Sequence, residues 1–400
     1  MPESRPIPLC FRHGPAEFDR EAVANREMPS SPARRARRHN TSMPTARYHG
    51  RRAAALENGD VRVTMLESGG HIAEVLDKRT GVNPLWTPNW PSIDPASYEP
   101  AQHAIYGGGV DAPLLAGIMG HNLCLDIFGG PSAEEAAAGL PVHGEVSVAR
   151  FEFTRSPNTL TAFTELPLAS LQLEREIALN DAWRGSIRIR ESVQNLSGID
   201  KPIAWTEHVT LGPPFLQKGS TEFRTSATRS KVFPNTFGPA DYLEPDAEFE
   251  WPHAPRHGGG SADLRVMNGA GVSSAYTAHL MNPGADRAFF VAFTPELRTS
   301  FGYVWRRADF PWMGIWEENN SRTAPPWNGA TLTRGMEFGA SPFPETRREM
   351  IERNRLFDAP TYRWIPAAGR ISVEYWIVIG SADAIPDTLD WVGGQDQTQR

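Results

Sequence analysis

The chain has 400 residues, of which 40% are hydrophobic and 22% charged, and its formal net charge at pH 7 is −7. This composition provides enough apolar material for a large core, and the negative charge argues against general attraction to nucleic acid or anionic membranes. No apolar run reaches the roughly 18 residues that a membrane-spanning helix needs, the N-terminus has no signal-peptide core, and the two cysteines cannot form a disulfide framework. We therefore expect a cytoplasmic protein with no membrane or nucleic-acid partner.

The first 45 residues differ in composition from the rest of the chain. Residues 29–39 are rich in proline and arginine and show no apolar periodicity. Such segments cannot bury enough apolar surface to fold. We predict a disordered N-terminal extension over residues 1–45 and a single β-sandwich domain over residues 46–395, with a nucleic-acid-binding tail as the alternative role of the extension.

Alternating apolar and polar residues dominate the chain from residue 61 onward. The alternation is clean over residues 171–179, 186–195 and 371–379, which is the pattern of strands with one buried face. Residues 289–293 are continuously apolar, as expected of a strand buried on both faces. We predict an all-β protein, built as an antiparallel sandwich, and the 35 glycines and 35 prolines agree with many turns.

Helical signals are few. Ser132 and Glu135 have the spacing of a capping box, in which each side chain bonds to the backbone N–H of the other residue. Residues 345–356 are predicted to form a short charged helix that begins just after Pro344. We therefore expect only short helices beside the strands.

Two long loops, residues 84–123 and 211–263, interrupt the predicted strands and contain several tryptophans and histidines, including His121. Long loops within a compact domain usually serve a function or are disordered. Aromatic rings bury the apolar face of a sugar with little loss of entropy. The 12 tryptophans of the chain therefore suggest a carbohydrate site, with core packing as the alternative.

Three later segments combine ionisable side chains with glycine or aromatic residues. His143 precedes a glycine, which lets backbone or a ligand approach closely. Strand alternation places Trp205 and Glu207 on one face and His208 on the other. Glu337 lies among apolar and small neighbours, an environment typical of carboxylates that transfer protons. A structural role for His143 and an arginine partner for Glu337 are the alternative interpretations.

Taken in order, these segments resemble motifs of the aldose 1-epimerase (galactose mutarotase-like) family. Residues 140–144 read LPVHG and look like the family's LP-x-HG element, and residues 207–211 are similar to the element that carries its second histidine. Residues 335–342 resemble the last motif, which holds a glutamate between a glycine and a proline. Similar segments at 68–75, 81–86 and 285–297 extend the resemblance over roughly residues 62–380.

The resemblance implies a super-sandwich whose concave face binds a sugar. By this resemblance, His208 protonates the ring oxygen and Glu337 removes the proton of the anomeric hydroxyl, so that the ring opens and recloses. His143 is expected to bind a sugar hydroxyl. Asp263 is the candidate for the family's binding aspartate, because of its distance before the apolar strand at 289–293.

Two departures from the family bear on the predicted ligand. Glu207 stands where the family normally has an asparagine. The arginine that closely follows this histidine and glycine in the hexose-phosphate relatives is missing after His143 and Gly144, which argues against a phosphorylated sugar. Residues 312–320 combine aromatic and acidic side chains that suit an uncharged, hydroxyl-rich ligand. The residues that we predict to bind the substrate are His121, His143, Glu207, Asp263, Trp316 and Glu317.

The predicted function is that of an isomerase similar to aldose 1-epimerases, which acts on a small carbohydrate without metal or cofactor, as a monomer or homodimer. One alternative is a lyase or glycoside hydrolase on the same fold, with Glu207, Glu317 and Glu337 as its carboxylates. A second alternative is a sugar-binding protein without catalysis. A metal ion held by His121, His143 and His208 is a further alternative.

Overall fold

The computed structural model describes residues 46–179 and 185–389. The predicted disordered extension over residues 1–45 lies outside the described residues, as do residues 390–395 at the end of the predicted domain. No helix within the described ranges has the length and hydropathy needed to cross a membrane.

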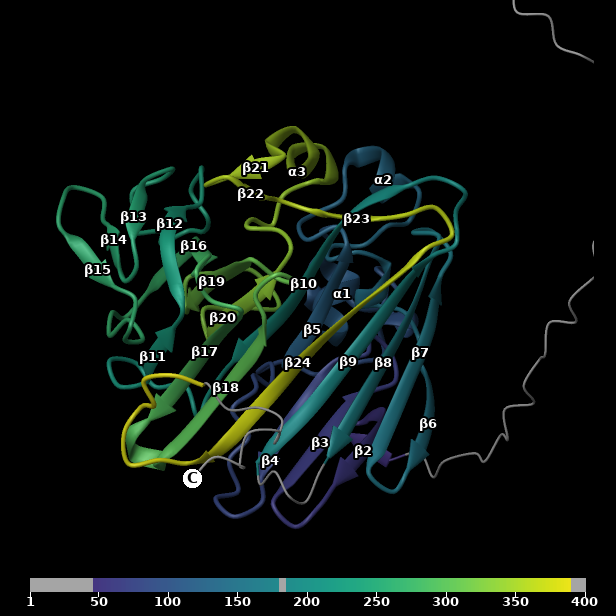
Figure 1. Cartoon of the computed structure of the whole chain (residues 1–400), viewed down its shortest axis with the longest axis horizontal. Helices are drawn as coiled ribbons and strands as arrows, with labels where there is room; N and C mark the ends of the chain where they lie inside the picture. Colours follow the sequence, from purple (N-terminus) through teal and green to yellow (C-terminus); the bar gives the residue numbers. More distant parts are fainter. Residues whose placement is uncertain (1–45, 180–184, 390–400) are drawn as a thin grey trace, which may run out of the picture. The chain divides into compact units, whose positions relative to one another are not determined.

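Two large antiparallel sheets make up most of the structure (Figure 1). The larger sheet has twelve strands, in the order β1 (Ala46–Tyr48), β2 (Arg51–Glu57), β3 (Val61–Leu66), β4 (Ile72–Asp77), β5 (His121–Asp126), β10 (Lys201–Leu211), β20 (Leu332–Gly339), β19 (Trp312–Asn319), β16 (Ser273–Met281), β12 (Ala227–Val232) and β13 (Glu248–Glu250), with β23 (Arg363–Ile365) paired to β10. The smaller sheet has eight strands, in the order β11 (Glu222–Thr225), β17 (Arg287–Thr294), β18 (Thr299–Arg306), β24 (Arg370–Ser381), β9 (Ser186–Asn195), β8 (Leu171–Leu179), β7 (Thr159–Leu166) and β6 (Glu152–Ser156).

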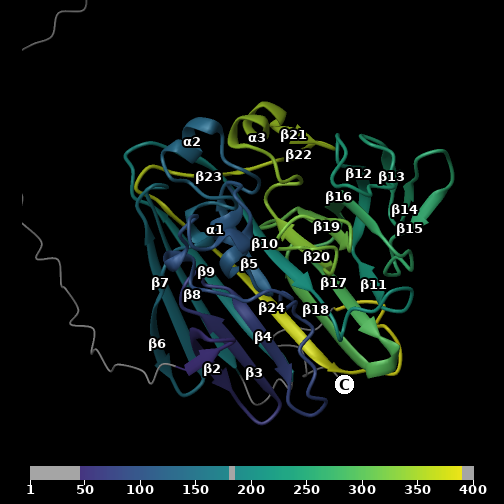
Figure 2. The same ribbon diagram turned by 180° about the vertical axis from the view of Figure 1, so that it is seen from behind.

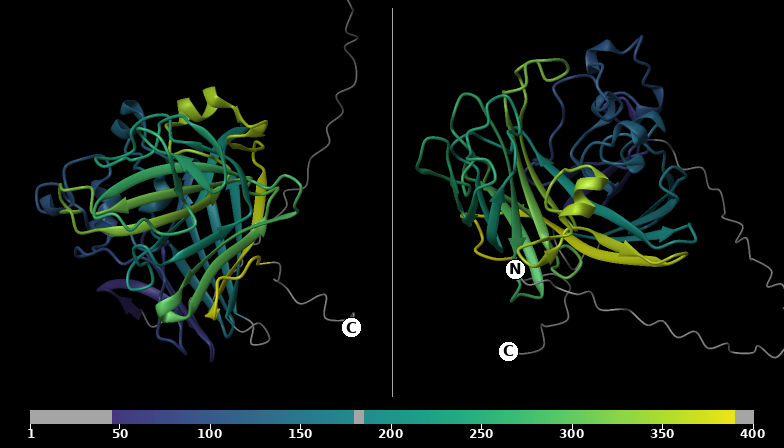
Figure 3. Two further views of the ribbon diagram at one scale, coloured as in Figure 1. Left: turned by 90° about the vertical axis from the view of Figure 1, so that its left-hand side faces the viewer. Right: turned by 90° about the horizontal axis from the view of Figure 1, so that it is seen from above.

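The remaining elements are short. Two small hairpins pair β14 (His253–Pro255) with β15 (Ser261–Asp263) and β21 (Arg355–Leu356) with β22 (Ala359–Pro360). The helices are α1 (Ala112–Gly117), α2 (Ala133–Ala137) and α3 (Arg347–Arg353), with single 3-10 turns η1 (Pro95–Ser97), η2 (Ala104–Tyr106), η3 (Glu145–Ser147) and η4 (Pro295–Leu297). The left view of Figure 3 shows α3 at one end of the strands.

The structure confirms the predicted fold class and its strands. The predicted strands 171–179 and 186–195 coincide with β8 and β9, and 371–379 lies within β24. Along β8 every second residue is buried, so one face packs inward and the other faces solvent. The capping box at Ser132 and Glu135 is formed at the start of α2. Helix α3 is shorter than the predicted 345–356, because Asn354 has a φ of 56° and ends the helix.

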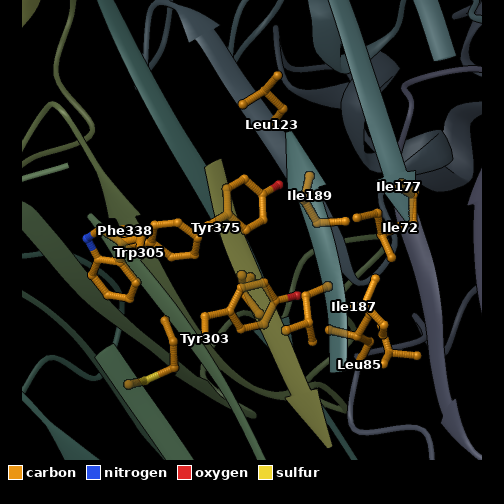
Figure 4. Packing of buried hydrophobic residues seen from close by; sticks show 14 of the residues in the cluster. Ile72, Leu85, Leu123, Ile177, Ile187, Ile189, Tyr303, Trp305, Phe338 and Tyr375 are labelled. Carbon is orange, nitrogen blue, oxygen red and sulfur yellow. The ribbon is translucent and has the colours of Figure 1, made fainter. Parts of the chain in front are cut away.

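The main core lies between the two sheets. Strands β9, β24 and β18 of the smaller sheet pass in front of β5, β10 and β20 of the larger sheet in Figure 1. Aromatic side chains from both sheets fill the space between them, and Figure 4 shows Tyr303, Trp305 and Tyr375 around Phe338. The rings of Trp305 and Phe338 stack with centroids 4.3 Å apart. This contact joins β18 of one sheet to β20 of the other.

A second apolar layer covers the other face of the larger sheet. Figure 2 shows α1 and its neighbouring loop over β5 and β10 on this face. Leu114 and Leu115 of α1 belong to one buried cluster with Cys124 of β5 and Tyr276 of β16. The central strands of the larger sheet are thus covered on both faces, which explains why β5, β10 and β20 are almost entirely buried.

His279 on β16, which lies on the opposite face of that strand from Tyr276, makes the stability of the fold sensitive to acid. Its ring nitrogens lie 2.8 Å from the hydroxyls of Ser230 and Thr277, and burial lowers its pKa to about 3, with a smaller contribution from Arg334. The folded pKa lies below the ordinary value of 6.5, so this stabilisation is complete above pH 6.5 and is lost as the pH falls toward 3. Between pH 6.5 and 4, we expect the free energy of unfolding to fall by roughly 3 kcal/mol less in His279→Gln than in the wild type.

Urea unfolding at several pH values checks this expectation. His257→Gln, which replaces a histidine whose side chain is 47% exposed, is measured alongside as the control. Parallel curves for the wild type and His279→Gln would contradict the assignment of this acid sensitivity to His279.

Candidate active site

A cavity of about 120 Å³ lies on the face of the larger sheet that is turned away from the smaller sheet. Its polar side chains are His143, His208 and Glu337 toward the sheet and Asp111 and Arg322 on the covering loops. The other side chains that line it are apolar or aromatic: Leu114, Leu115, Ile118, Phe128, Val142, Phe237, Tyr276, Trp316, Trp327 and Pro344. Apolar walls with a few convergent polar groups are typical of small-molecule sites.

His208 and Glu337 stand side by side in this cavity. They are direct cross-strand partners in the antiparallel pair β10–β20, and His208 Nε2 lies 3.0 Å from Glu337 Oε1. Their sequence neighbours Glu207 and Phe338 point the other way, into the space between the sheets. Alternation along both strands therefore directs the histidine and the glutamate into the same cavity.

The surroundings of His208 fix the orientation of its ring. His208 Nδ1 lies 3.1 Å from the hydroxyl of Thr210, two residues along the same face of β10. The ring of Trp316 packs against the imidazole with a centroid distance of 5.7 Å. These contacts leave Nε2 as the ring nitrogen that is directed toward Glu337 and the cavity.

Small residues beside Glu337 make room for its carboxylate. Oε1 is buried and has no hydrogen bond of good geometry with the described residues, so it can accept one from a ligand. A β-carbon at Gly335 would overlap Oε1, and one at Gly314, the partner of Glu337 on β19, would overlap the hydroxyl of Tyr276. Burial and the neighbouring Glu337 carboxylate raise the pKa of Tyr276 well above its ordinary value, so its hydroxyl remains protonated.

Gly335→Ala should therefore impair the site while the fold persists. The added methyl group must displace the end of the Glu337 side chain, which is flexible, rather than backbone. A misplacement of about 1 Å at a catalytic group can cost about 100-fold in rate, so we expect a loss of 10- to 100-fold in kcat/KM for the turnover proposed below. Gly380→Ala on β24 is the matched control, because its added methyl group has no described neighbour within 4 Å. Full activity of Gly335→Ala would show that the position of the carboxylate is unimportant.

The loop that carries His143 is held close to β5 by its backbone. His143 has a φ of 67°, and Gly144 follows with a φ of 81°. A β-carbon at Gly144 would overlap the carbonyl oxygen of Leu125, so only glycine permits this approach. The structure thus confirms the close backbone approach that the sequence predicts at this glycine.

His143 is neutral and oriented by a second side chain. Asn122 Nδ2 lies 3.1 Å from His143 Nδ1 and donates to it, so the ring proton is on Nε2. Burial, together with the charge of His208, lowers the pKa of His143 well below its ordinary value. The two imidazole rings lie 5.0 Å apart. His143 can therefore donate a hydrogen bond within the cavity but is not a proton source near neutral pH.

Two of the predicted binding residues, His121 and Glu207, lie between the sheets instead of in the cavity. His121 Nε2 is 2.8 Å from Glu207 Oε2, and the hydroxyl of Tyr375 is 2.9 Å from the same oxygen. Arg175 lies 3.4 Å from Glu207 Oε2 and 2.5 Å from Glu191 Oε1. All of these side chains are buried. They form an internal polar network, because odd-numbered residues of β5 and β10 face the smaller sheet.

Two further predicted residues, Glu317 and Asp263, also lie outside the cavity. Glu317 follows Trp316 on β19, so its side chain points to the opposite face of the strand from the cavity. There it accepts a hydrogen bond of 2.5 Å from the Ser273 hydroxyl. Asp263 lies in the β14–β15 hairpin and pairs with Arg265 at 2.7 Å. Of the eight predicted residues, the structure brings four to the cavity: His143, His208, Trp316 and Glu337.

The carboxylate and histidine sets of the alternative hypotheses are not assembled either. Of Glu207, Glu317 and Glu337, only Glu337 lines the cavity. The three histidines proposed to hold a metal are divided between the two faces of the larger sheet, since His121 faces the smaller sheet. Within the described ranges there is no group of three or more His, Cys, Asp or Glu side chains with the geometry of a metal site.

Sequence reasoning missed several residues of the cavity. Asp111 and Phe237 belong to the two long loops that were expected to form binding-site walls, but nothing in their local sequence distinguishes them. Arg322 and Trp327 come from the loop between β19 and β20, next to Pro325 and Pro326. Trp327, a tryptophan directly after two prolines, is the one feature of this loop's sequence that could have indicated a binding site.

Comparison with solved structures identifies the fold. A proposed aldose 1-epimerase from Klebsiella pneumoniae is similar over 84% of this chain and 80% of its own, with 12% identity and a TM-score of 0.59. A galactose mutarotase related enzyme from Lactobacillus acidophilus is similar over 84% and 99%, with 12% identity and a TM-score of 0.52. A proposed aldose 1-epimerase from Escherichia coli K12 is similar over 82% and 99%, with 10% identity and a TM-score of 0.55.

No protein-family model matches the sequence, and no curated protein matches it. The chain has the galactose mutarotase-like fold, which confirms the predicted resemblance at the level of fold. Identities of 10–12% with these structures leave the reaction to be argued from the site itself.

Proposed function

We propose that this protein is an aldose 1-epimerase-like enzyme that interconverts the anomers of a free, unphosphorylated monosaccharide. The observation that carries the proposal is the pairing of His208 with Glu337, 3.0 Å apart in one apolar cavity. The ring oxygen and the anomeric hydroxyl of a sugar are bonded to the same carbon. An acid and a base that serve these two oxygens must therefore be close neighbours, as these residues are.

The reaction requires two proton transfers in each direction. The Glu337 carboxylate takes the proton of the anomeric hydroxyl while His208, in its protonated form, gives a proton to the ring oxygen. The bond between the anomeric carbon and the ring oxygen breaks, and an open-chain aldehyde forms. After rotation about the bond next to the aldehyde, the hydroxyl adds to its other face and both protons return. His143 Nε2–H can donate a hydrogen bond to a sugar oxygen throughout.

The charges of the cavity support a neutral sugar as its ligand. Arg322 is the only Lys or Arg side chain among the described residues that line it, and Glu318 already pairs with this arginine at 3.4 Å. A phosphate group would therefore find no uncompensated cation.

A glycoside hydrolase needs two carboxyl groups about 5–9.5 Å apart around the scissile bond. Besides Glu337, the cavity has only one other carboxylate on the described residues, that of Asp111 on the covering loop. A His/Glu pair at direct contact matches anomer exchange better than it matches glycoside cleavage.

Polarimetry of freshly dissolved α-anomers, across a panel of free aldoses, tests the proposal. The wild type should accelerate the approach to the equilibrium rotation for at least one aldose. Methyl glycosides of the same sugars are the control, and their rotation should remain constant. Cleavage of a glycoside would favour the hydrolase alternative, whereas binding without any acceleration would favour a sugar-binding protein.

A further inference from the structure

Two side chains of opposite charge line the cavity from separate loops. Asp111 immediately precedes α1, and Arg322 belongs to the loop between β19 and β20. Both line the cavity that holds His208 and Glu337. Neither has a part in the proton transfers described above.

Arg322 is held in place but keeps hydrogen-bond donors free. Its Nε lies 3.4 Å from Glu318 Oε2, and its guanidinium carbon lies 4.8 Å from the ring centroid of Trp327 and 5.6 Å from that of Trp316. Its two terminal nitrogens make no hydrogen bond to any side chain or backbone group of the described residues. An arginine has five N–H donors, so four remain for a ligand.

Among the described residues, the Asp111 carboxylate has no partner. It occupies the N-cap position of α1, yet its side chain makes no capping hydrogen bond. It also forms no ion pair or hydrogen bond with another described side chain. Burial lowers the pKa of Arg322, and the carboxylates of Glu318 and Asp111 oppose this shift, which places Asp111 within electrostatic reach of the guanidinium.

We propose that Asp111 and Arg322 are specificity-determining residues, which together bind two adjacent hydroxyls of the sugar at the end of the ring away from its anomeric carbon. The inference rests on the proposed function, which assigns the anomeric carbon to His208 and Glu337. Trp316 lies between the catalytic pair and Arg322, since its ring lies 5.7 Å from the His208 ring and 5.6 Å from the Arg322 guanidinium carbon.

The chemistry of an adjacent pair of hydroxyls fits these two groups. Each hydroxyl both donates and accepts a hydrogen bond. A carboxylate only accepts and a guanidinium only donates, so the pair satisfies both capacities of a diol. An anionic substituent at this end of the ring would meet the Asp111 carboxylate, while the charge of Arg322 is already balanced by Glu318. The site therefore selects a neutral diol over a uronate.

The test uses the aldose that binds best in the panel, together with its 3-deoxy and 4-deoxy analogues. Binding is measured by calorimetry in the full chain carrying Glu337→Gln, so that affinity does not depend on turnover. Hydrogen bonds to charged groups lead us to expect that removal of either hydroxyl weakens binding by about 10- to 100-fold. Asp111→Asn and Arg322→Gln should each weaken binding of the parent sugar by a similar factor.

The decisive comparison is between the variants and the deoxy sugars. In Arg322→Gln or Asp111→Asn, at least one deoxy analogue should bind as well as the parent sugar, because its missing hydroxyl no longer has a partner. Arg348→Gln on α3 is the control, and it should keep the full preference for the parent sugar. The melting temperature of each variant separates lost contacts from lost folding.

Three outcomes would overturn the inference. Removal of a hydroxyl from the sugar could weaken binding equally in the wild type and in both variants, and Arg322 would then be a structural residue that packs on Trp327. A uronate could bind more tightly than the neutral sugar, which would mean that Arg322 binds a carboxylate. No sugar could bind at all, which would remove both proposals. Sugar binding that depends on Asp111 and Arg322 without anomer exchange would leave the inference standing and overturn only the proposed function.

Discussion

Glu337→Gln should slow anomer exchange by about 100- to 10,000-fold, the usual contribution of a general base. The amide has nearly the shape of the carboxylate, but it cannot take the proton of the anomeric hydroxyl. Oε1 accepts no hydrogen bond from the described residues, so its loss should affect proton transfer more than the packing of β20. Polarimetry gives the rate, and calorimetry should show that affinity for the sugar changes much less.

The control for this variant is Glu352→Gln on α3, whose side chain is 61% exposed and pairs with Arg348. It should have wild-type activity. His208→Asn should lose a comparable factor, and the double variant should be little worse than either single one, because the two groups act as a unit. Rates of Glu337→Gln within a factor of three of the wild type would contradict the role of Glu337 as the base.

Arg175→Met should lower the free energy of unfolding by about 3–5 kcal/mol, the cost of breaking a buried ion pair by removing one partner. Arg175 pairs with Glu191 at 2.5 Å and with Glu207 at 3.4 Å, and all three side chains are at most 1% exposed. Methionine would fill much of the volume but leave two buried carboxylates without their cation. Urea unfolding at pH 7 measures this loss.

The same variant should depend on pH with a definite sign. Burial raises the pKa of Glu191 to about 7, while Arg175 lowers it, so the pKa should rise further when the arginine is removed. A carboxyl group with a raised folded pKa loses stability as the pH increases toward that value. The destabilisation of Arg175→Met should therefore be larger at pH 8 than at pH 5.

Two further variants serve as comparisons for Arg175→Met. Arg188→Met on β9 removes a partly exposed pair with Glu176 and should cost no more than about 1 kcal/mol. Adding Glu191→Gln to Arg175→Met should restore part of the lost stability, because one unpaired carboxylate is removed. Equal losses for Arg175→Met and Arg188→Met would show that the internal network contributes nothing beyond a surface ion pair.

The alternation of apolar residues was enough to predict the strands that became β8, β9 and most of β24, because one face of each is buried against the other sheet. The same alternation predicts that Glu207 and His208 lie on opposite faces of β10. It does not predict which face lines a cavity, since that depends on the elements that cover each face. The resemblance to mutarotases assigned His208 to the site, and the covering layer around α1 explains why that face holds the cavity.

The residues that the sequence could not place depend on long-range contacts. The register that sets His208 opposite Glu337 joins β10 and β20, which are more than a hundred residues apart, and no local pattern encodes it. Only its distance along the chain makes Asp263 a candidate, and the β14–β15 hairpin places it outside the cavity. Asp111 and Arg322 lie on loops, where side-chain direction is set by tertiary packing rather than by periodicity.

Magnetisation-transfer NMR in D2O tests the central claim most directly. The wild type, added to an equilibrated solution of the aldose that binds best, should transfer saturation between the α- and β-anomer signals far faster than the Glu337→Gln variant does. In spectra recorded without saturation, the signals of the carbon-bound hydrogens should keep their full intensity over time, because ring opening breaks a carbon–oxygen bond and removes protons only from oxygen. Anomer exchange at the uncatalysed rate, or loss of a carbon-bound hydrogen to deuterium, would contradict acid–base ring opening by His208 and Glu337.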